Sequence, residues 1–236
     1  MRYGDIDFPE PIIEALGSGT LVIFVGAGVS RDRPSCYPDF KFLAKEAGRE
    51  FAFDDKRYSP FDRYFGRLEQ AKPGRVHDWV RSRLDAPDSR PNDHHRSLLK
   101  LFGGANRVRV VTTNFDRHLT AAAASVYPGE SIEEHRAPSL PVGSHFSGLV
   151  YLHGSVAGPA ERLVLTDADF GRAYLTEGWA CRFLLELFRT YTILFVGYSG
   201  QDAVVNYLAR GLPPDGAKAY AFASRSEEHT SELQSH

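Results

Sequence analysis

The stretch LVIFVGAGVS, residues 21–30, decides the fold of this chain. Five apolar residues rich in Val, Ile and Phe run into two closely spaced glycines, which predicts a buried strand, Leu21 to Gly26, that ends in a tight turn. Three similar runs follow, RVRVVTTN (107–114), GLVYLHG (148–154) and TILFVGYS (192–199). KAYAFAS (218–224) predicts a final strand and LVLT (163–166) a short one. Because helical patterns separate these runs, we predict an α/β fold with a doubly wound, Rossmann-like, mainly parallel sheet.

The chain of 236 residues is long enough for one such domain, which we expect to cover residues 1–224. Between the first two strong strands lie roughly eighty residues, far more than a simple crossover needs. Segments there carry apolar residues three and four positions apart, which predicts a small inserted helical subdomain at about residues 32–95. HRSLLKLF follows as the crossover helix, and IIEAL, between Pro11 and Gly17, predicts a helix before the first strand.

The last dozen residues, RSEEHTSELQSH, break with the apolar, periodic sequence before them. They resemble the in-frame translation of a sequencing adapter, so we expect residues 225–236 to be a non-native read-through tail and leave them out of the fold. On this interpretation the natural protein continues beyond Ser224 into a further C-terminal region.

Composition and charge exclude several classes of protein. The chain is 42% hydrophobic with a formal net charge of −2, and its basic residues are scattered, so we expect no nucleic-acid binding by this segment. The apolar run 21–29 is too short to cross a bilayer and follows acidic residues, which predicts a cytoplasmic protein with no membrane contact. Cys36 and Cys181 are expected to be buried thiols rather than a disulfide.

Residues suited to chemistry follow each predicted strand. In a doubly wound sheet, ligands bind beyond the carboxyl ends of the strands, at the switch point. The first strand ends in GAGVS (26–30), the second in TTNFD (112–116), the third in HG (153–154) and the fourth in GYSGQD (197–202). Each ending alone has an ordinary explanation as a turn, a structural histidine or a helix cap. Four such endings in order predict a shared site at this edge of the sheet.

GAGVS, TTNFD, HG and GYS, in that order, resemble the NAD-binding motifs of the sirtuins, and most closely those of the sirtuin-like domains of bacterial anti-phage defence proteins. The resemblance covers about residues 17–224. It implies that the cofactor-binding residues are Gly26, Ala27, Gly28, Ser30, Thr113, Asn114, Asp116, Gly197 and Ser199. It further implies that the glycine turn holds the pyrophosphate, that Asn114 and Asp116 lie around the nicotinamide ribose, and that Asn114 and His153 are catalytic.

Two departures from the family pattern bear on the activity. Protein-deacetylating sirtuins usually hold a structural zinc with four cysteines, and this chain has only two cysteines, so we expect no zinc module and no metal cofactor. GYSGQD also differs from the GTSL-type ending of the deacetylating branch. Both differences favour hydrolysis of NAD, which would be the substrate.

The resemblance therefore predicts an NAD glycohydrolase that yields nicotinamide and ADP-ribose, or a cyclised product. Asn114 would position the ribose or the attacking water, and His153, with a pKa near neutrality, would accept a proton. A non-catalytic sensor of NAD or ADP-ribose remains an alternative, as does, less favoured, an NAD-dependent deacylase. Gln201 stands where a nucleophile elbow needs glycine, and no P-loop lysine is present. Expected partners are NAD, a missing C-terminal domain or a separate defence protein, and further copies of the chain in a homo-oligomer.

Overall fold

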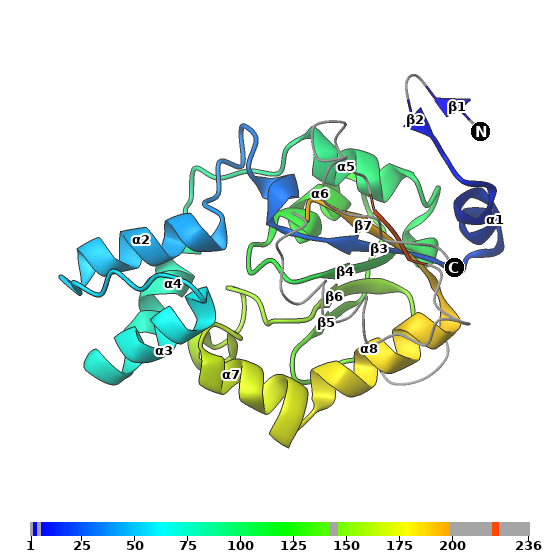
Figure 1. Ribbon diagram of the computed structural model, residues 1–236. Helices are drawn as coiled ribbons and strands as arrows, with labels where there is room; N and C mark the ends of the chain where they lie inside the picture. Colours follow the sequence, from blue (N-terminus) through cyan, green and yellow to red (C-terminus); the bar gives the residue numbers. More distant parts are fainter. Residues whose placement is uncertain (1, 4–5, 142–145, 199–218, 222–236) are drawn as a thin grey trace.

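The computed structural model describes residues 2–3, 6–141, 146–198 and 219–221. A six-stranded sheet forms its centre, and all five pairings between neighbouring strands are parallel (Figure 1). Its strands are β3 (Leu21–Val25), β4 (Arg109–Thr112), β5 (Glu134–Arg136), β6 (Gly148–Tyr151), β7 (Thr192–Val196) and β8 (Ala219–Ala221), in the order β5-β6-β4-β3-β7-β8. Two short strands, β1 (Arg2–Tyr3) and β2 (Ile6–Asp7), form a separate antiparallel pair.

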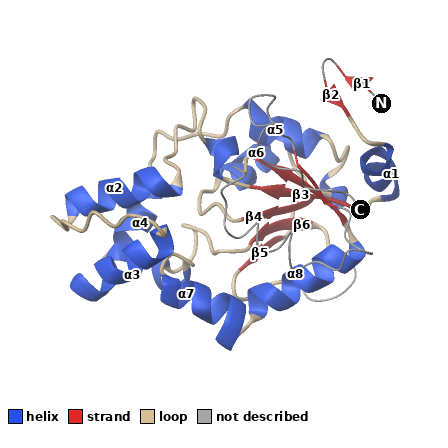
Figure 2. Cartoon of the chain, viewed as in Figure 1, coloured by secondary structure: helices blue, strands red, loops and turns tan. Residues whose placement is uncertain are grey.

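Helices cover both faces of the sheet and one end of it (Figure 2). The α-helices are α1 (Glu10–Ser18), α2 (Phe40–Glu50), α3 (Phe61–Ala71), α4 (Val76–Leu84), α5 (Asp93–Lys100), α6 (His118–Val126), α7 (Asp167–Gly171) and α8 (Trp179–Thr190). Short 3-10 helices are η1 (Ala27–Ser30), η2 (Ala105–Arg107) and η3 (Ala160–Arg162), and η4 (Arg172–Thr176) is a π-helix. The predicted α/β, Rossmann-like class is confirmed.

The path of the chain places the switch point beside β3. From β3 the chain passes to β4 and then to the outer strands β5 and β6, and it returns to β7 and β8 on the other side of β3. Val25, the last residue of β3, lies opposite both Thr112 of β4 and Val196 of β7. The carboxyl ends of the three central strands are therefore level, and the loops that follow them meet.

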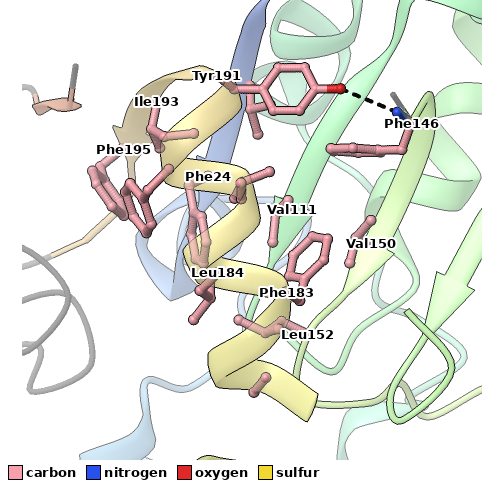
Figure 3. Close-up of a cluster of buried hydrophobic side chains, with 14 of the residues drawn as sticks. Phe24, Val111, Phe146, Val150, Leu152, Phe183, Leu184, Tyr191, Ile193 and Phe195 are labelled. Atoms are coloured by element: carbon pink, nitrogen blue, oxygen red, sulfur yellow. Dashed lines mark hydrogen bonds between the residues drawn. The ribbon is translucent and has the colours of Figure 1, made fainter. Parts of the chain in front are cut away.

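The two faces of the sheet carry separate hydrophobic layers because successive side chains of a strand point to opposite faces. Val22 and Phe24 pack with Phe183 and Leu184 of α8, as Figure 3 shows for Phe24. The alternate residues of β3 pack against α5 and α6 on the other face. Burial on both faces explains why β3 is apolar throughout rather than alternating.

Helices α2, α3 and α4 form a third hydrophobic cluster at the strand ends, on the left in Figure 1. Their buried side chains, such as Phe65 and Leu68, pack with Phe115, which follows β4, and with Val156, which follows β6. The helical insertion thus rests on the loops that carry the predicted site.

Several predictions from sequence need correction. LVLT forms no strand, because the Val164 N–H donates to the His153 carbonyl at 2.9 Å and Thr166 caps α7. The edge strand β5 was not predicted from EHR, which is short and polar. Helix α1 runs past Gly17 to Ser18 and ends at Gly19, whose φ is +74°. Cys36 and Cys181 are unbridged but exposed, so the expectation of burial is wrong.

Two predictions concern residues outside the described ranges: the cofactor contact of Ser199 and the read-through tail at 225–236. Within the part of the chain that the structure describes, no helix has both the length and the apolar character needed to cross a bilayer.

Candidate functional site

The turns after β3 and β7 touch backbone to backbone. The Gly26 N–H donates to the Val196 carbonyl at 2.9 Å, and the Gly28 N–H donates to the Gly197 carbonyl at 2.8 Å. A Cβ on Gly28 would lie 2.7 Å from the Gly197 oxygen. Gly197 itself has φ of +76°, a conformation that glycine adopts freely. Close packing of the two turns therefore requires the glycines, while Ala27 between them is exposed.

Asn114 is bonded to the glycine turn. Its Nδ2 donates to the Gly26 carbonyl at 3.1 Å and lies 3.5 Å from Ser30 Oγ. Its backbone N–H donates to Thr112 Oγ1 at 3.0 Å, which fixes the start of the loop. Asn114 is partly exposed. Nδ2 is the donor in both of these side-chain hydrogen bonds of Asn114. The Oδ1 carbonyl oxygen is therefore the atom that can accept a hydrogen bond from a ligand.

Asp116 is the buried centre of the hydrogen bonds beneath the turn. Its Oδ2 accepts from Ser30 Oγ at 2.9 Å, and its Oδ1 accepts from the His118 backbone N–H at 2.9 Å. His118 Nδ1 also lies 2.9 Å from Oδ1. Burial alone would raise the pKa of Asp116, but the contacts with His118 and His95 outweigh it and lower the pKa. The carboxylate therefore stays ionised inside the protein.

Two buried histidines in this network were not singled out from the sequence. His95 Nε2 lies 3.1 Å from Ser30 Oγ, and the rings of His95 and His118 stack with centroids 5.2 Å apart. Burial lowers the pKa of His95 to about 4, so its ring is neutral at physiological pH. The sequence feature that could have pointed to His95 is Asn92, three residues before it. Asn92 caps α5, and the two residues form a reciprocal capping box.

Tyr198 lies over the glycine turn. Its hydroxyl lies 2.8 Å from Thr113 Oγ1 and donates to the Val25 carbonyl at 3.2 Å. A Cβ on Gly26 would meet the Tyr198 ring at 2.8 Å. Thr113 and Tyr198 are both half-buried, so they form part of the surface at the strand ends. The sequence placed Tyr198 within the GYS motif but gave it no role of its own.

His153 lies at the same edge of the sheet, after β6. Thr112 and Tyr151 are paired, and the Leu152 N–H donates to the Thr112 carbonyl at 2.8 Å, so the loops bearing Asn114 and His153 start side by side. Yet His153 is only 5% exposed. Burial lowers its pKa to about 3, so the expectation of a pKa near neutrality is wrong. The imidazole is neutral at physiological pH.

The structure thus brings most of the predicted site residues together and leaves one apart. Gly26, Ser30, Asn114 and Asp116 form one hydrogen-bonded cluster, with Thr113, Gly28 and Gly197 beside it. His153 instead turns toward η4, where its Nε2 lies 2.8 Å from Tyr174 Oη. Among the described contacts none joins His153 to Asn114.

Two further features of the described residues bear on ligands. An open surface hollow of about 920 Å³ lies against α3 of the helical insertion and is lined by Phe53, Arg57, Arg67 and their neighbours, none of which is a predicted site residue. Within the described ranges, no group of three or more His, Cys, Asp or Glu side chains is placed to hold a metal ion.

Comparison with protein families settles the relationship of the chain. The family model of the SIR2-like domain matches residues 108–236, more than half of the 236 residues. The chain belongs to the SIR2-like domain family. The matched range contains Asn114, Asp116, His153 and Gly197, whereas the glycine turn lies before it. Domains of this family use NAD, so membership associates the chain with NAD-related activity.

One curated relative is similar along most of this SIR2-like chain. It is "Uncharacterized protein y4cA" of Sinorhizobium fredii (strain NBRC 101917 / NGR234), which is 31% identical over 231 residues. The similarity covers 89% of this chain and 19% of the relative. The chain therefore spans about a fifth of the length of the protein it matches.

The residues at the strand ends suit NAD. Ala27 is exposed, and Gly28, Thr113, Asn114 and Gly197 are half-buried, so backbone and amide groups reach the surface at the switch point. Polar groups and glycines of this kind are what a dinucleotide needs in order to approach a strand end closely.

Proposed function

We propose that this SIR2-like domain hydrolyses NAD at the bond between nicotinamide and ribose. NAD and water would give nicotinamide, ADP-ribose and a proton, and a cyclised product would form without consuming water. One observation carries the proposal: Asn114, Ser30 and Asp116 are bonded into a single cluster against the glycine turn, at the switch point of the sheet. A ligand that reaches this turn meets the Asn114 amide.

The chemistry needs orientation more than acid strength. Cleavage passes through an oxocarbenium-like state, and nicotinamide is already a good leaving group. Asn114 Oδ1 would accept a hydrogen bond from a ribose hydroxyl or from the attacking water, while its Nδ2 holds to the Gly26 carbonyl. The turn from Gly26 to Ser30 would lie along the pyrophosphate, and Thr113 and Gly197 would line the remaining cofactor surface.

Asp116 would act beneath the surface. It is ionised, buried and bonded to Ser30, and Ser30 is in turn within 3.5 Å of Asn114 Nδ2. The carboxylate therefore holds the ribose-binding side of the site in one arrangement. His153, neutral and close to the same strand end, would accept the proton that the reaction releases.

The cysteine content favours hydrolysis over protein deacylation. The chain holds two cysteines, both exposed, and a four-cysteine zinc module of the deacetylating sirtuins cannot be assembled from two. We therefore propose that the domain has no zinc module of this kind and hydrolyses NAD.

The biological setting we propose is the effector domain of a longer bacterial anti-phage defence protein, acting in the cytoplasm. The resemblance of the motifs to defence-associated domains supports this. So does the relative from Sinorhizobium fredii, which extends far beyond the matched region. A further domain or a separate defence partner would then control the activity.

A second candidate is a sensor that binds NAD or ADP-ribose without cleaving it. The burial of His153 and its contact with Tyr174 favour this interpretation. Measuring nicotinamide release by chromatography beside a calorimetric NAD titration separates the two. Hydrolysis predicts binding together with release, and binding without release would make the domain a sensor.

A matched pair of variants ties the result to the site. Asn114→Ala should abolish most of the release, whereas Asn106→Ala, at an exposed asparagine of η2, should leave it unchanged. Equal loss in both variants, or in neither, would contradict the role of Asn114.

A further inference from the structure

His153 is enclosed by a segment in which the sequence shows no motif. Phe170, at the end of α7, packs edge-on against the His153 ring with centroids 5.2 Å apart and an interplanar angle of 79°. Tyr174, one helical turn later in η4, stacks on Phe170 with an interplanar angle of 12°. Its hydroxyl oxygen lies 2.8 Å from His153 Nε2. Two aromatic rings and one hydrogen bond therefore define the orientation of the imidazole.

The contact with Tyr174 decides which ring nitrogen can act as a base. A neutral imidazole has one nitrogen that donates and one that accepts. If Nε2 carries the proton and donates it to Tyr174 Oη, the lone pair lies on Nδ1. If the Tyr174 hydroxyl donates instead, Nε2 is already used as an acceptor and Nδ1 carries the proton, so the ring has no free base. Only the first arrangement gives His153 a proton-accepting atom.

Contacts with neighbouring parts of the chain hold the segment around Tyr174 in place. Thr166 and Asp169 form a capping box at the start of α7, and Asp169 Oδ2 also lies 2.8 Å from His77 Nε2 of α4. Ala173, beside Tyr174, is fully buried in the layer under α8. The Val164 N–H, just before α7, holds the His153 carbonyl at 2.9 Å. Both partners of the contact are thus fixed by neighbouring parts of one segment.

We infer that Tyr174 is a positioning residue for His153: it accepts the Nε2 proton, so that Nδ1 is the atom that takes up a proton when NAD is cleaved. The inference rests on the proposed function for its catalytic consequence. The tautomer of His153 can be measured independently of any turnover.

Tyr174→Phe tests this with little other change, since it keeps the ring against Phe170 and removes only the hydroxyl. We expect kcat for nicotinamide release to fall by roughly 10- to 100-fold with KM nearly unchanged, because an orienting partner is lost while the NAD contacts remain. Tyr127→Phe is the matched control. It removes another tyrosine hydroxyl bond, to the Leu99 carbonyl at 2.7 Å, on the opposite face of the sheet.

A long-range ¹H–¹⁵N correlation spectrum reads the tautomer directly. The His153 signals are assigned by their absence from the His153→Gln spectrum. The parent should show a protonated Nε2 and an unprotonated Nδ1, and Tyr174→Phe should show a mixture of tautomers, whereas Tyr127→Phe should match the parent. A merely structural role of Tyr174 would not move this balance.

Three results would overturn the inference: a parent tautomer with the proton on Nδ1, an unchanged tautomer in Tyr174→Phe, or a rise in kcat in that variant. A rise in kcat would mean that the hydrogen bond with Tyr174 occupies the proton-accepting nitrogen of His153 and leaves no free base. If the parent released no nicotinamide but the tautomer shifted as expected, the proposed function would fail and the assignment of Tyr174 would stand.

Discussion

Substituting Gly28 by alanine tests the packing that shapes the candidate site. The new Cβ would lie 2.7 Å from the Gly197 oxygen and 2.9 Å from the Gly197 Cα. Both atoms belong to backbone that is anchored by the pairing of β3 with β7, so neither can move aside cheaply. We therefore expect the turns after β3 and β7 to be forced apart.

The cost of Gly28→Ala follows from overpacking. Forcing a methyl group into a filled space typically costs about 1–3 kcal/mol. No further strain is expected from the backbone, because the φ of Gly28 lies outside the left-handed region. For a chain of this length the melting temperature should fall by roughly 2–12 °C. NAD binding should weaken as well, since the displaced turn is the one proposed to lie along the pyrophosphate.

The assay is urea denaturation followed by circular dichroism, with calorimetry for the melting temperature and for the NAD titration. Gly17→Ala is the matched control, because Gly17 lies in α1 with no heavy atom near its added Cβ. That variant should be unchanged or up to about 1 kcal/mol more stable, since alanine favours helices. Equal unfolding midpoints for Gly28→Ala and the parent would refute the reasoning.

Two further predictions concern pH. Burial alone would lower the pKa of His77, but the Asp169 and Glu69 carboxylates outweigh burial and raise it. Below about pH 6.5 the parent should therefore be more stable than His77→Gln by on the order of 1 kcal/mol. This advantage should be lost as the pH rises through the raised pKa of His77. Urea denaturation at about pH 5.5 and about pH 9 checks this, and an advantage that grows toward alkaline pH would contradict it. The second prediction concerns Asp116, whose pKa is lowered. Above about pH 4 the parent should be about 3 kcal/mol more stable than Asp116→Asn. This difference should shrink as the pH falls through the lowered pKa of Asp116. Asp93→Asn, at an exposed carboxylate, is the control, and an Asp116→Asn variant as stable as the parent at neutral pH would exclude a buried, ionised Asp116.

The central strands could be predicted because burial on both faces leaves an uninterrupted apolar run. β3 and β7 show this most clearly, since nearly all their residues are buried. The same signal misled at LVLT, where Leu163 and Leu165 are buried among the insertion helices instead of in the sheet. β5 was missed for the opposite reason. It lies at the edge of the sheet, where its side chains are less buried, so its three residues need not be apolar.

That most candidate residues lie near one another was predictable, but their contacts were not. The glycine turn and Asn114 come together because parallel strands end at one edge, which spacing along the chain reveals. The surroundings of His153 could not be foreseen, since Phe170 and Tyr174 lie in a segment without a motif and approach the ring only through the packing of α7 and η4. The same holds for the approach of His95 to Ser30, which depends on how α5 docks beneath the turn.

The most direct measurement of the proposed activity compares NAD cleavage and NAD binding in the parent and in His153→Ala. A proton acceptor typically contributes roughly a hundred- to ten-thousand-fold, so nicotinamide release should fall by about that factor while calorimetry still detects NAD binding. His94→Ala, at an exposed histidine of α5, should retain the rate of the parent. Release by His153→Ala at the parent's rate would show that His153 takes no part in cleaving NAD.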